Sequence, residues 1–156
     1  MLMMPTRLVP IAPSASSPAA RRVMQGNARR ETSPERELRG ALHRRGLRFR
    51  KNYSPVRGIR CRVDVVFIAA RLAVFVDGCF WHSCSEHGTS PRTNADWWRL
   101  KLAANVERDR RNSAALKAAG WTVLRLWEHE PVETMVDQIT GVLRCPPSER
   151  AELRGE

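Results

Sequence analysis

Short apolar runs in the middle of the chain predict β-strands. Residues 62–70 (RVDVVFIAA) and 72–78 (LAVFVDG) are rich in β-branched side chains and are separated by a short turn at Arg71. Two such runs so close together predict a hairpin of buried strands. Residues 121–127 (WTVLRLW) have the same character and predict a third strand.

Apolar residues with helical spacing predict a helix before these strands, at residues 31–46. Thr32 or Ser33 is expected to cap this helix, Pro34 suits its first turn, and Gly46 ends it. The apolar face of the helix consists of Leu38, Ala41 and Leu42.

Two further helices are expected around the third strand. Residues 95–120 predict a long helix that Asn94 can cap and Gly120 ends, and residues 131–144 predict a last helix. The apolar positions of the long helix include Trp97, Leu100, Val106 and Leu116, and those of the last helix are Val132, Met135, Ile139 and Val142. Because a strand after a long helix can return parallel to the strand before it, the element order predicts an α/β sandwich with a mixed sheet.

The length of the chain, 156 residues, fits one domain with short tails. Residues 1–20, rich in Pro, Ala and Ser, predict a disordered N-terminal tail; residues 21–145 predict the folded domain and residues 146–156 a C-terminal tail. No run of 18 apolar residues predicts a membrane helix, and early prolines interrupt any secretory signal. We therefore expect a cytoplasmic protein whose four cysteines are reduced thiols or metal ligands.

Positive charge is concentrated in the first part of the chain. The formal net charge is +11; residues 1–60 contain 14 basic and 3 acidic side chains, whereas residues 61–156 contain 13 of each. A one-sided basic region predicts a polyanionic partner, most simply nucleic acid, with a merely solubilising face as the alternative. An arm at residues 21–32 is the predicted DNA-binding segment, and its basic residues are Arg21, Arg22, Arg29 and Arg30.

Four side chains have the residue types of a zinc site. Cys79, Cys84 and His87 lie within nine residues, and His129 follows the third strand. If the second and third strands are parallel neighbours, their C-terminal ends meet and His129 lies beside Cys79. Two thiolates and two imidazoles complete a tetrahedral site with no open position, which is typical of structural zinc. The alternative is that they are ordinary buried cysteines and unrelated histidines.

Three acidic residues suggest a second metal site, with a catalytic role. Asp64 lies inside an apolar strand, where a charge is costly unless it is paired, hydrogen-bonded or bound to a metal. Asp77 ends the next strand, and Glu35 lies on the first helix. Acidic groups on adjacent strands are typical of a Mg²⁺ site for phosphodiester cleavage. For Glu35 the alternative is a capping box at the helix start, and for Asp77 it is a turn position.

A histidine and two aromatic residues complete the chemistry of this segment. His82 follows Cys79 too closely to share its zinc site, and a free imidazole beside Mg²⁺ is suited to be the general base for water. Phe80 and Trp81 are adjacent, so in a strand they would point to opposite faces. Apolar side chains can unstack base steps of DNA, so we interpret the pair as a DNA wedge. Packing of one of them in the core is the alternative.

Several strings of the sequence resemble the very-short-patch repair (Vsr-type) endonucleases: VDVVF, VFVDGCFWHSC, NVERDRR and GWTVLRLWEHE. The resemblance covers residues 21–143 and includes ETSPERELRGAL near the start; GCFWH and NVERDRR are its most specific parts. It implies a fold like that of type II restriction endonucleases. It also implies an enzyme that nicks DNA beside a T:G mismatch left by deamination of 5-methylcytosine.

The resemblance implies roles for individual residues. Asp64 corresponds to the central Mg²⁺ ligand, and Val76 stands where the family uses a backbone carbonyl for the same ion. His82 corresponds to the histidine that activates water, and Glu35 to the helix glutamate near the active site. The DNA contacts correspond to Phe80 and Trp81 beside the mismatch and Met24 in the arm, and the zinc positions to Cys79, Cys84, His87 and His129.

Two departures from the family pattern concern the same segment. The best-known pattern has a run of histidines where this chain has SCSEH, which shifts the alignment of Cys84 and His87. Asp77 replaces a histidine thought to touch the substrate phosphate, so its role as a further Mg²⁺ ligand is open. The position of the lysine of restriction-type nucleases is taken by Cys79, which favours a histidine-based mechanism.

The expected activity is Mg²⁺-dependent, strand-specific nicking of double-stranded DNA 5′ of the T in a T:G mismatch, which starts very-short-patch repair. The protein is expected to act as a nucleoid-associated monomer, with mismatch-repair proteins as further partners. One alternative is a restriction-type nuclease that cuts both strands. Another is a zinc-stabilised DNA-binding module without catalysis, against which Asp64 and His82 argue.

Overall fold

The computed structural model describes residues 11–15, 17–19, 21–22, 32–89 and 91–152. Its centre is a four-stranded sheet with the strand order β1-β2-β3-β4. The strands are β1 (Arg50–Tyr53), β2 (Val63–Phe67), β3 (Leu72–Asp77) and β4 (Thr122–Trp127). β1 pairs with β2 and β2 with β3 in antiparallel fashion, whereas β3 and β4 are parallel. The predicted hairpin and mixed sheet are therefore confirmed.

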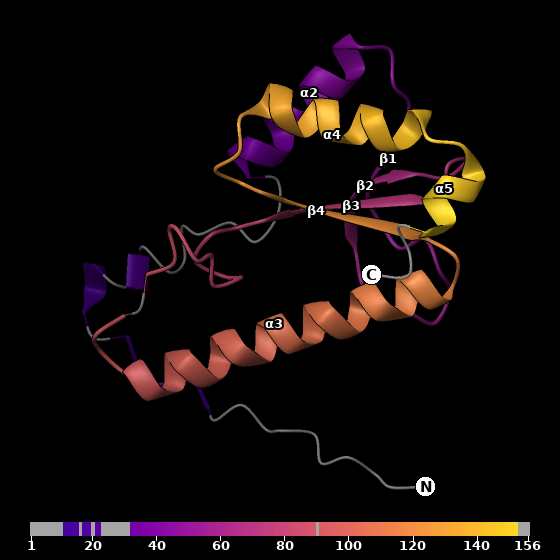
Figure 1. The fold of residues 1–156 in the computed structure, drawn as a ribbon. Coiled ribbons are helices and arrows are strands. Elements are labelled where there is room, and N and C mark those ends of the chain that lie inside the picture. The colour runs from indigo at the N-terminus through magenta and orange to yellow at the C-terminus, as the bar shows by residue number, and fades with distance from the viewer. Residues whose placement is uncertain (1–10, 16, 20, 23–31, 90, 153–156) are drawn as a thin grey trace, which may run out of the picture.

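Helices cover both faces of this sheet (Figure 1). α2 (Ser33–Arg44) and α4 (Val132–Arg144) lie on one face, and α3 (Ala95–Ala118) lies on the other. The core under α2 and α4 includes Leu38, Leu42, Val65, Val74, Leu126, Met135 and Ile139. The core on the opposite face includes Val66, Ala73, Phe75, Leu116 and Trp121. Because successive side chains of a strand point to opposite faces, β3 contributes Leu72 and Val74 to one core and Ala73 and Phe75 to the other.

The predicted helix starts need one correction. Thr32 occupies the N-cap position of α2 and Asn94 that of α3, but neither side chain makes a capping hydrogen bond. The Thr32 hydroxyl instead donates to Glu35 Oε1 at 3.1 Å. Asn94 has φ 56° and ψ 38°, a left-handed conformation that differs from the extended one of a capping residue.

Two elements were not predicted from the sequence. β1 is polar and largely exposed, so it lacks the apolar run of a buried strand; its pairing with β2 defines it. α5 (Pro147–Glu152) lies within the expected C-terminal tail. Arg150 of this helix donates to the Ala70 carbonyl at 3.1 Å, and Thr122 donates to the Arg150 carbonyl at 3.4 Å. These contacts tie α5 to the end of the sheet where β3 and β4 begin.

α3 is longer than the sheet that it covers, and its N-terminal part extends toward the loop after β3 (Figure 1). Only Asn105 and Leu116 of this helix are buried. Leu100 and Val106, two of its predicted apolar positions, are 40% and 42% exposed. The N-terminal part of α3 therefore contributes little to the core and presents apolar surface to its surroundings.

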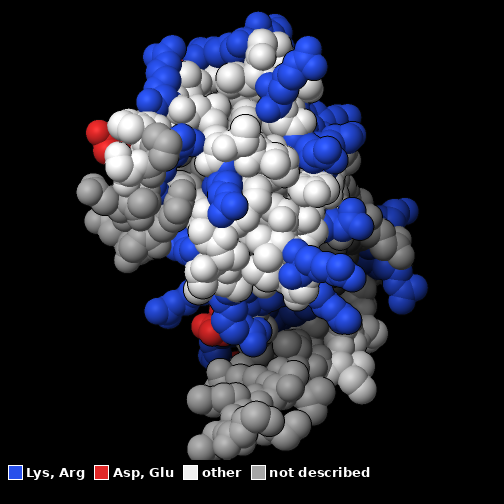
Figure 2. Space-filling model, turned by 90° about the vertical axis from the view of Figure 1, so that its right-hand side faces the viewer, with Lys and Arg blue, Asp and Glu red and all other residues white. Residues whose placement is uncertain are grey.

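Basic side chains are exposed over much of the domain. Figure 2 shows them spread over the face at the right-hand side of Figure 1, with few acidic residues among them. The exposed basic residues between residues 32 and 71 are Arg36, Arg44, Arg45, Arg48, Arg50, Lys51, Arg57, Arg60, Arg62 and Arg71. Because positive charge is so widespread, only basic residues close to a functional site can indicate how DNA is placed.

The predicted DNA-binding arm is described only in part. Arg21 and Arg22 are exposed, whereas Met24, Arg29 and Arg30 lie outside the described residues. Among the helices that the structure describes, none combines the length and apolarity needed to cross a membrane.

Candidate active site and metal centre

A cavity of about 600 Å³ opens between the sheet, α2 and α3. The residues predicted for Mg²⁺ binding and water activation all line this cavity: Glu35, Asp64, Val76, Asp77 and His82. They come from α2, β2, β3 and the loop after β3, so the fold brings together side chains that are up to 47 positions apart.

The Asp64 carboxylate is the most perturbed acid of the cavity. Its Oδ2 accepts a hydrogen bond of 2.8 Å from the Val76 N–H, which fixes the carboxylate beside the end of β3. Burial, with a smaller contribution from the negative charges of Glu35 and Asp77, raises the pKa of Asp64 to about 6. A buried carboxylate among other carboxylates is suited to a cation, since a positive ion offsets the unfavourable terms.

Glu35 lies both at the start of α2 and in the cavity, the two environments that the sequence suggested for it. It accepts the Thr32 hydroxyl at the start of α2, and its Oε2 lies 3.5 Å from Arg39 Nη1. The residue is only 5% exposed and still lines the cavity. Contact with the helix start therefore does not remove Glu35 from the site.

His82 is oriented by carboxylates at one of its two ring nitrogens. Its Nδ1 lies 2.8 Å from Asp109 Oδ2 and 3.7 Å from Asp77 Oδ1. The closer contact lacks hydrogen-bond alignment, because this buried Asp109 oxygen has no aligned donor. Burial would raise the pKa of Asp109, but His82 and Arg108 outweigh burial and hold this pKa below its usual value. Nε2 is the ring nitrogen left for chemistry.

Asp77 is buried and paired with an arginine that the sequence analysis did not single out. Arg125 of β4 donates from Nε to Asp77 Oδ2 at 2.7 Å and from Nη2 to Asp77 Oδ1 at 2.6 Å. Asp77 is 6% exposed, so it is not an ordinary surface turn residue. Both of its oxygens are engaged by the guanidinium, which leaves Asp77 less free than Asp64 to serve a metal.

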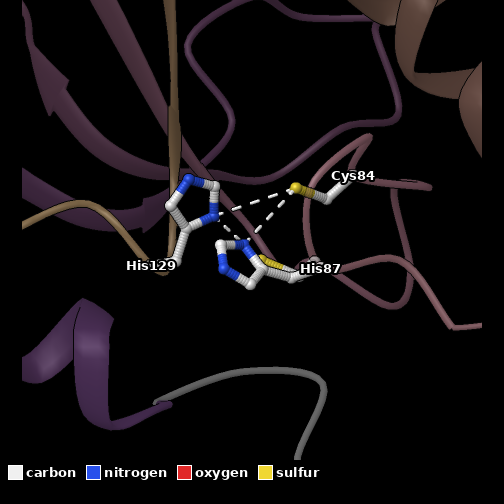
Figure 3. A group of neighbouring side chains, drawn as sticks. Cys84, His87 and His129 are labelled. Atoms are coloured by element: carbon white, nitrogen blue, oxygen red, sulfur yellow. Dashed lines mark hydrogen bonds between the residues drawn. The ribbon is translucent and has the colours of Figure 1, made fainter.

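The predicted zinc residues lie together at the ends of β3 and β4. The ligand atoms of Cys79, Cys84, His87 and His129 are all within 4.8 Å of one another. Figure 3 shows the Cys84 sulfur and the rings of His87 and His129 directed toward one another. Cys79 Sγ lies 3.1 Å from His129 Nδ1, and Cys84 Sγ lies 3.8 Å from the same nitrogen. Metal–ligand bonds of about 2.0–2.3 Å place tetrahedral ligands between 3 and 4 Å apart, so the four residues can hold one ion.

Backbone hydrogen bonds hold the four residues of the Cys/His cluster close together. The Cys79 N–H donates to Glu128 Oε1 at 2.7 Å, which ties the loop after β3 to the end of β4. Gly88 donates to the Cys84 carbonyl at 2.8 Å, and a Cβ on Gly88 would lie 2.3 Å from that oxygen. Only glycine fits this turn. Burial and the neighbouring Cys84 raise the pKa of Cys79 to about 11, so a cation is needed for the Cys79 thiol to be charged at neutral pH.

Phe80 and Trp81 belong to an aromatic cluster with Trp98 from the first turn of α3. The ring centroids of Phe80 and Trp81 are 5.0 Å apart, and those of Phe80 and Trp98 are 5.3 Å apart. The expectation that Phe80 and Trp81 lie in a strand is wrong, because β3 ends at Asp77 and a turn follows. The three rings are half-buried and contact each other, and none of them belongs to the two described core clusters.

Sequence reasoning missed three residues that the structure places in these sites. Asp109 lies in the NVERDRR string, to which no chemical role was given. Arg125 interrupts the apolar strand β4 in the same way that Asp64 interrupts β2, and this signal could have identified it. Trp98 lies within the predicted long helix, and no role was assigned to it. Arg60, Arg62 and Arg108 also line the cavity and add positive charge to its wall.

A cavity with several carboxylates and a histidine, bordered by arginines, is typical of a hydrolase that acts on an anionic substrate. The family model described as "DNA mismatch endonuclease Vsr" matches residues 16–87. The type II nicking enzyme V.NaeI of Lentzea aerocolonigenes is 47% identical over 124 residues, which are 78% of this chain and 75% of that protein. The chain therefore belongs to the Vsr family, and it is a DNA endonuclease.

Other relatives agree with this assignment. The type II nicking enzyme V.XorIIP of Xanthomonas oryzae pv. oryzae is 40% identical over 116 residues, 73% of this chain and 83% of that protein. The DNA mismatch endonuclease Vsr of Escherichia coli is 38% identical over 107 residues, 67% of this chain and 66% of that protein. The similarity extends beyond the residues that the family model matches.

Asp64→Asn is expected to stabilise the protein in magnesium-free buffer at pH 8, by up to about 3 kcal/mol. Wild-type Asp64 must ionise in a place that raises its pKa from 3.8 to about 6, whereas Asn keeps the acceptor for Val76 without the charge. The gain is absent below pH 3.8, grows as the pH rises to about 6 and is constant above.

Urea unfolding of the two proteins at pH 5 and pH 8 measures this difference. Asp96→Asn is the control, because the Asp96 side chain is 87% exposed on α3. A wild type as stable as Asp64→Asn at pH 8 would contradict the raised pKa.

Proposed function

We propose that the protein nicks one strand of duplex DNA immediately 5′ of the T in a T:G mismatch, in a Mg²⁺-dependent reaction that starts very-short-patch repair. The observation that carries this proposal is the meeting of Asp64 and His82 in one cavity. The nicking enzymes among the relatives support single-strand cleavage. The mismatch endonuclease of E. coli supports a mismatch as the substrate.

Asp64 and the Val76 carbonyl are the groups that would hold Mg²⁺, with Glu35 close to them. The bound ion would supply charge neutralisation at the phosphate and lower the pKa of water. The cavity fits such a cation, since burial and, to a smaller degree, the nearby Glu35 and Asp77 raise the pKa of Asp64. Asp77 is the weaker candidate ligand because Arg125 engages both of its oxygens.

His82 is proposed to accept the proton of the attacking water at Nε2. Its Nδ1 faces Asp109, whose carboxylate stabilises the imidazolium that forms. The low pKa of Asp109 keeps this carboxylate charged at neutral pH. Attack of the water on phosphorus then breaks one P–O bond of the backbone, and one such centre cleaves one strand.

DNA would be held by charge at the cavity and by aromatic rings beside it. Arg60, Arg62 and Arg108 line the cavity, where guanidinium groups can contact backbone phosphates. The aromatic cluster is proposed to enter the base stack at the mismatch, because a T:G pair stacks and pairs less well than a Watson–Crick pair. The arm at residues 21–32, with Met24, is proposed as a further contact from the other groove.

We propose that the Cys/His cluster binds one structural Zn²⁺. Two cysteines and two histidines match the ligand set of closed zinc sites, and the spacing of their ligand atoms supports it. The ion would join the loop after β3 to the end of β4, and so fix the positions of His82 and the aromatic cluster relative to each other.

The mixed sheet between helical layers supports the proposal that the fold is like that of restriction endonucleases. The protein is further proposed to be a nucleoid-associated monomer that works with mismatch-repair proteins.

Cleavage is expected to be confined to the strand that carries the mismatched T. Asp64→Ala should abolish nicking while T:G binding survives, because the cation site is lost but the aromatic cluster is kept. His82→Ala should slow cleavage by about 10²–10⁴-fold, the usual contribution of a general base. The assay is a T:G duplex labelled on one strand at a time, with and without Mg²⁺, resolved on a denaturing gel. Equal cutting of both strands would favour a restriction-type nuclease, and full activity of Asp64→Ala would refute the assignment of the site.

The purified protein is expected to contain one zinc per chain. Alanine in place of Cys79, Cys84, His87 or His129 should lower the zinc content and unfold the protein, because a lost ligand removes folding free energy. Metal analysis and circular dichroism measure the two effects. Cys145→Ser is the control and should retain zinc. A well-folded wild type without zinc would end this proposal.

The aromatic cluster is expected to set the preference for mismatched DNA. Phe80→Ala, Trp81→Ala and Trp98→Ala should each reduce the ratio of T:G to matched affinity more than they reduce affinity for matched DNA. Competition binding with both duplexes measures this ratio. Leu100→Ala is the control, since Leu100 is an exposed apolar residue of α3 outside the cluster. Variants that discriminate like wild type would show that the rings serve packing alone.

A further inference from the structure

Arg125 is the one charged residue of β4, and it lines the cavity. Besides its two bonds to Asp77, it donates from Nη1 to Ser113 Oγ at 3.1 Å, and its guanidinium lies over the Phe75 ring at 4.7 Å. Contacts on several sides hold the guanidinium in one orientation. Its pKa is raised because the Asp77 pair outweighs the effect of burial, so the group stays charged.

The two carboxylates nearest His82 both lie within reach of Arg125. Asp77 approaches His82 Nδ1 to 3.7 Å and Asp109 approaches it to 2.8 Å. Arg125 Nη2 lies 2.6 Å from Asp77 Oδ1 and 3.9 Å from Asp109 Oδ2. One arginine therefore connects the two carboxylates that compete for one ring nitrogen.

The bidentate geometry decides this competition. Both oxygens of Asp77 are taken by the planar guanidinium, so Asp77 is held away from His82 and Asp109 is left as the partner of Nδ1. With Asp77 released, its carboxylate would be a second negative group next to the imidazole, and the ring could turn toward it. A lysine would not replace this function, because an ammonium is a point charge and cannot engage both oxygens in a fixed fork.

We propose that Arg125 is a positioning residue for His82: by holding Asp77 it assigns Nδ1 to Asp109 and keeps Nε2 directed to the attacking water. This inference rests on the proposed role of His82 as the general base. It also gives Asp77 a role, since Asp77 then anchors Arg125 and does not bind the metal or the substrate phosphate.

The first test compares Arg125→Met with the double variant Asp77→Asn/Arg125→Met. The single variant should lower the single-turnover nicking rate about 10–100-fold, since a misdirected catalytic group costs up to about 10²-fold. Its Kd for T:G duplex should stay within about twofold of wild type, because Asp77 and Ser113 already engage the Arg125 guanidinium. The double variant removes the competing charge and should recover most of the lost rate.

Arg45→Met is the matched control for the loss of a paired arginine. Arg45 also contacts two carboxylates, Glu133 at 2.7 Å and Asp137 at 2.9 Å, but it lies on the α2–α4 surface. Its nicking rate should equal that of wild type. Should Arg125→Met not fold, Arg125→Lys takes its place, with the same expected loss of rate. An unchanged rate, a double variant as slow as the single one, or a loss expressed in Kd would each overturn the inference.

A second measurement does not depend on nicking. Long-range ¹H–¹⁵N spectra at fixed pH report which nitrogen of the neutral His82 ring carries the proton. The wild type should show the proton on Nδ1, facing Asp109, and Arg125→Met should show a mixture or the other tautomer. If the wild type does not nick but Arg125→Met still changes the His82 tautomer, the proposed function is refuted and the positioning role is kept. A nicking wild type whose His82 signals are unaffected by Arg125→Met would remove the positioning role alone.

Discussion

The parallel pairing of β3 and β4 is the constraint on which the rest of the site depends. In this register Asp77 lies opposite Trp127 and Phe75 lies opposite Arg125, so both strands end at the same edge of the sheet. The loop that follows β3 and the residues that follow β4 are therefore neighbours, although they are about 50 positions apart in the chain. The Cys/His cluster, the Asp77–Arg125 pair and the loop that carries His82 are all built on this edge.

Charge balance is the second requirement of the cavity. Four carboxylates and four arginines line it, so the formal charges balance, but arginines contact only some of the carboxylates. Removing one partner of a buried ion pair such as Asp77–Arg125 costs about 3–5 kcal/mol, while the whole stability of a domain is about 5–15 kcal/mol. Asp64 is the carboxylate for which the structure provides no such arginine contact among the described residues, and burial raises its pKa to about 6. In the proposed function Asp64 is thus the acid suited to a cation, whereas the Arg125 side chain neutralises Asp77.

The sequence predicted the buried elements well and the polar pairings poorly. The β2–β3 hairpin, β4 and the helices are encoded in local apolar patterns, and so is the meeting of Cys79 with His129, because strand direction follows from the long connecting helix. The pairings of His82 with Asp109 and of Asp77 with Arg125 depend on the rotation of α3 and on the register of β4, which no local pattern specifies. β1 was not predicted, because an exposed edge strand needs no apolar run. The turn after Asp77 was not predicted, because bulky residues typical of strands follow Asp77 closely.

α3 carries Trp98 near one end and Asp109 farther along, with Leu116 anchoring it to the core. Eleven residues separate Trp98 from Asp109, which in an α-helix is about three turns and about 16 Å, with both side chains on nearly the same side. In the proposed function, the helix fixes the distance between the Trp98 ring, which would enter the base stack, and the carboxylate beside His82. The proposed distance between the lesion and the cut would then depend on helical pitch, and one inserted residue would turn the ring about 100° around the helix axis.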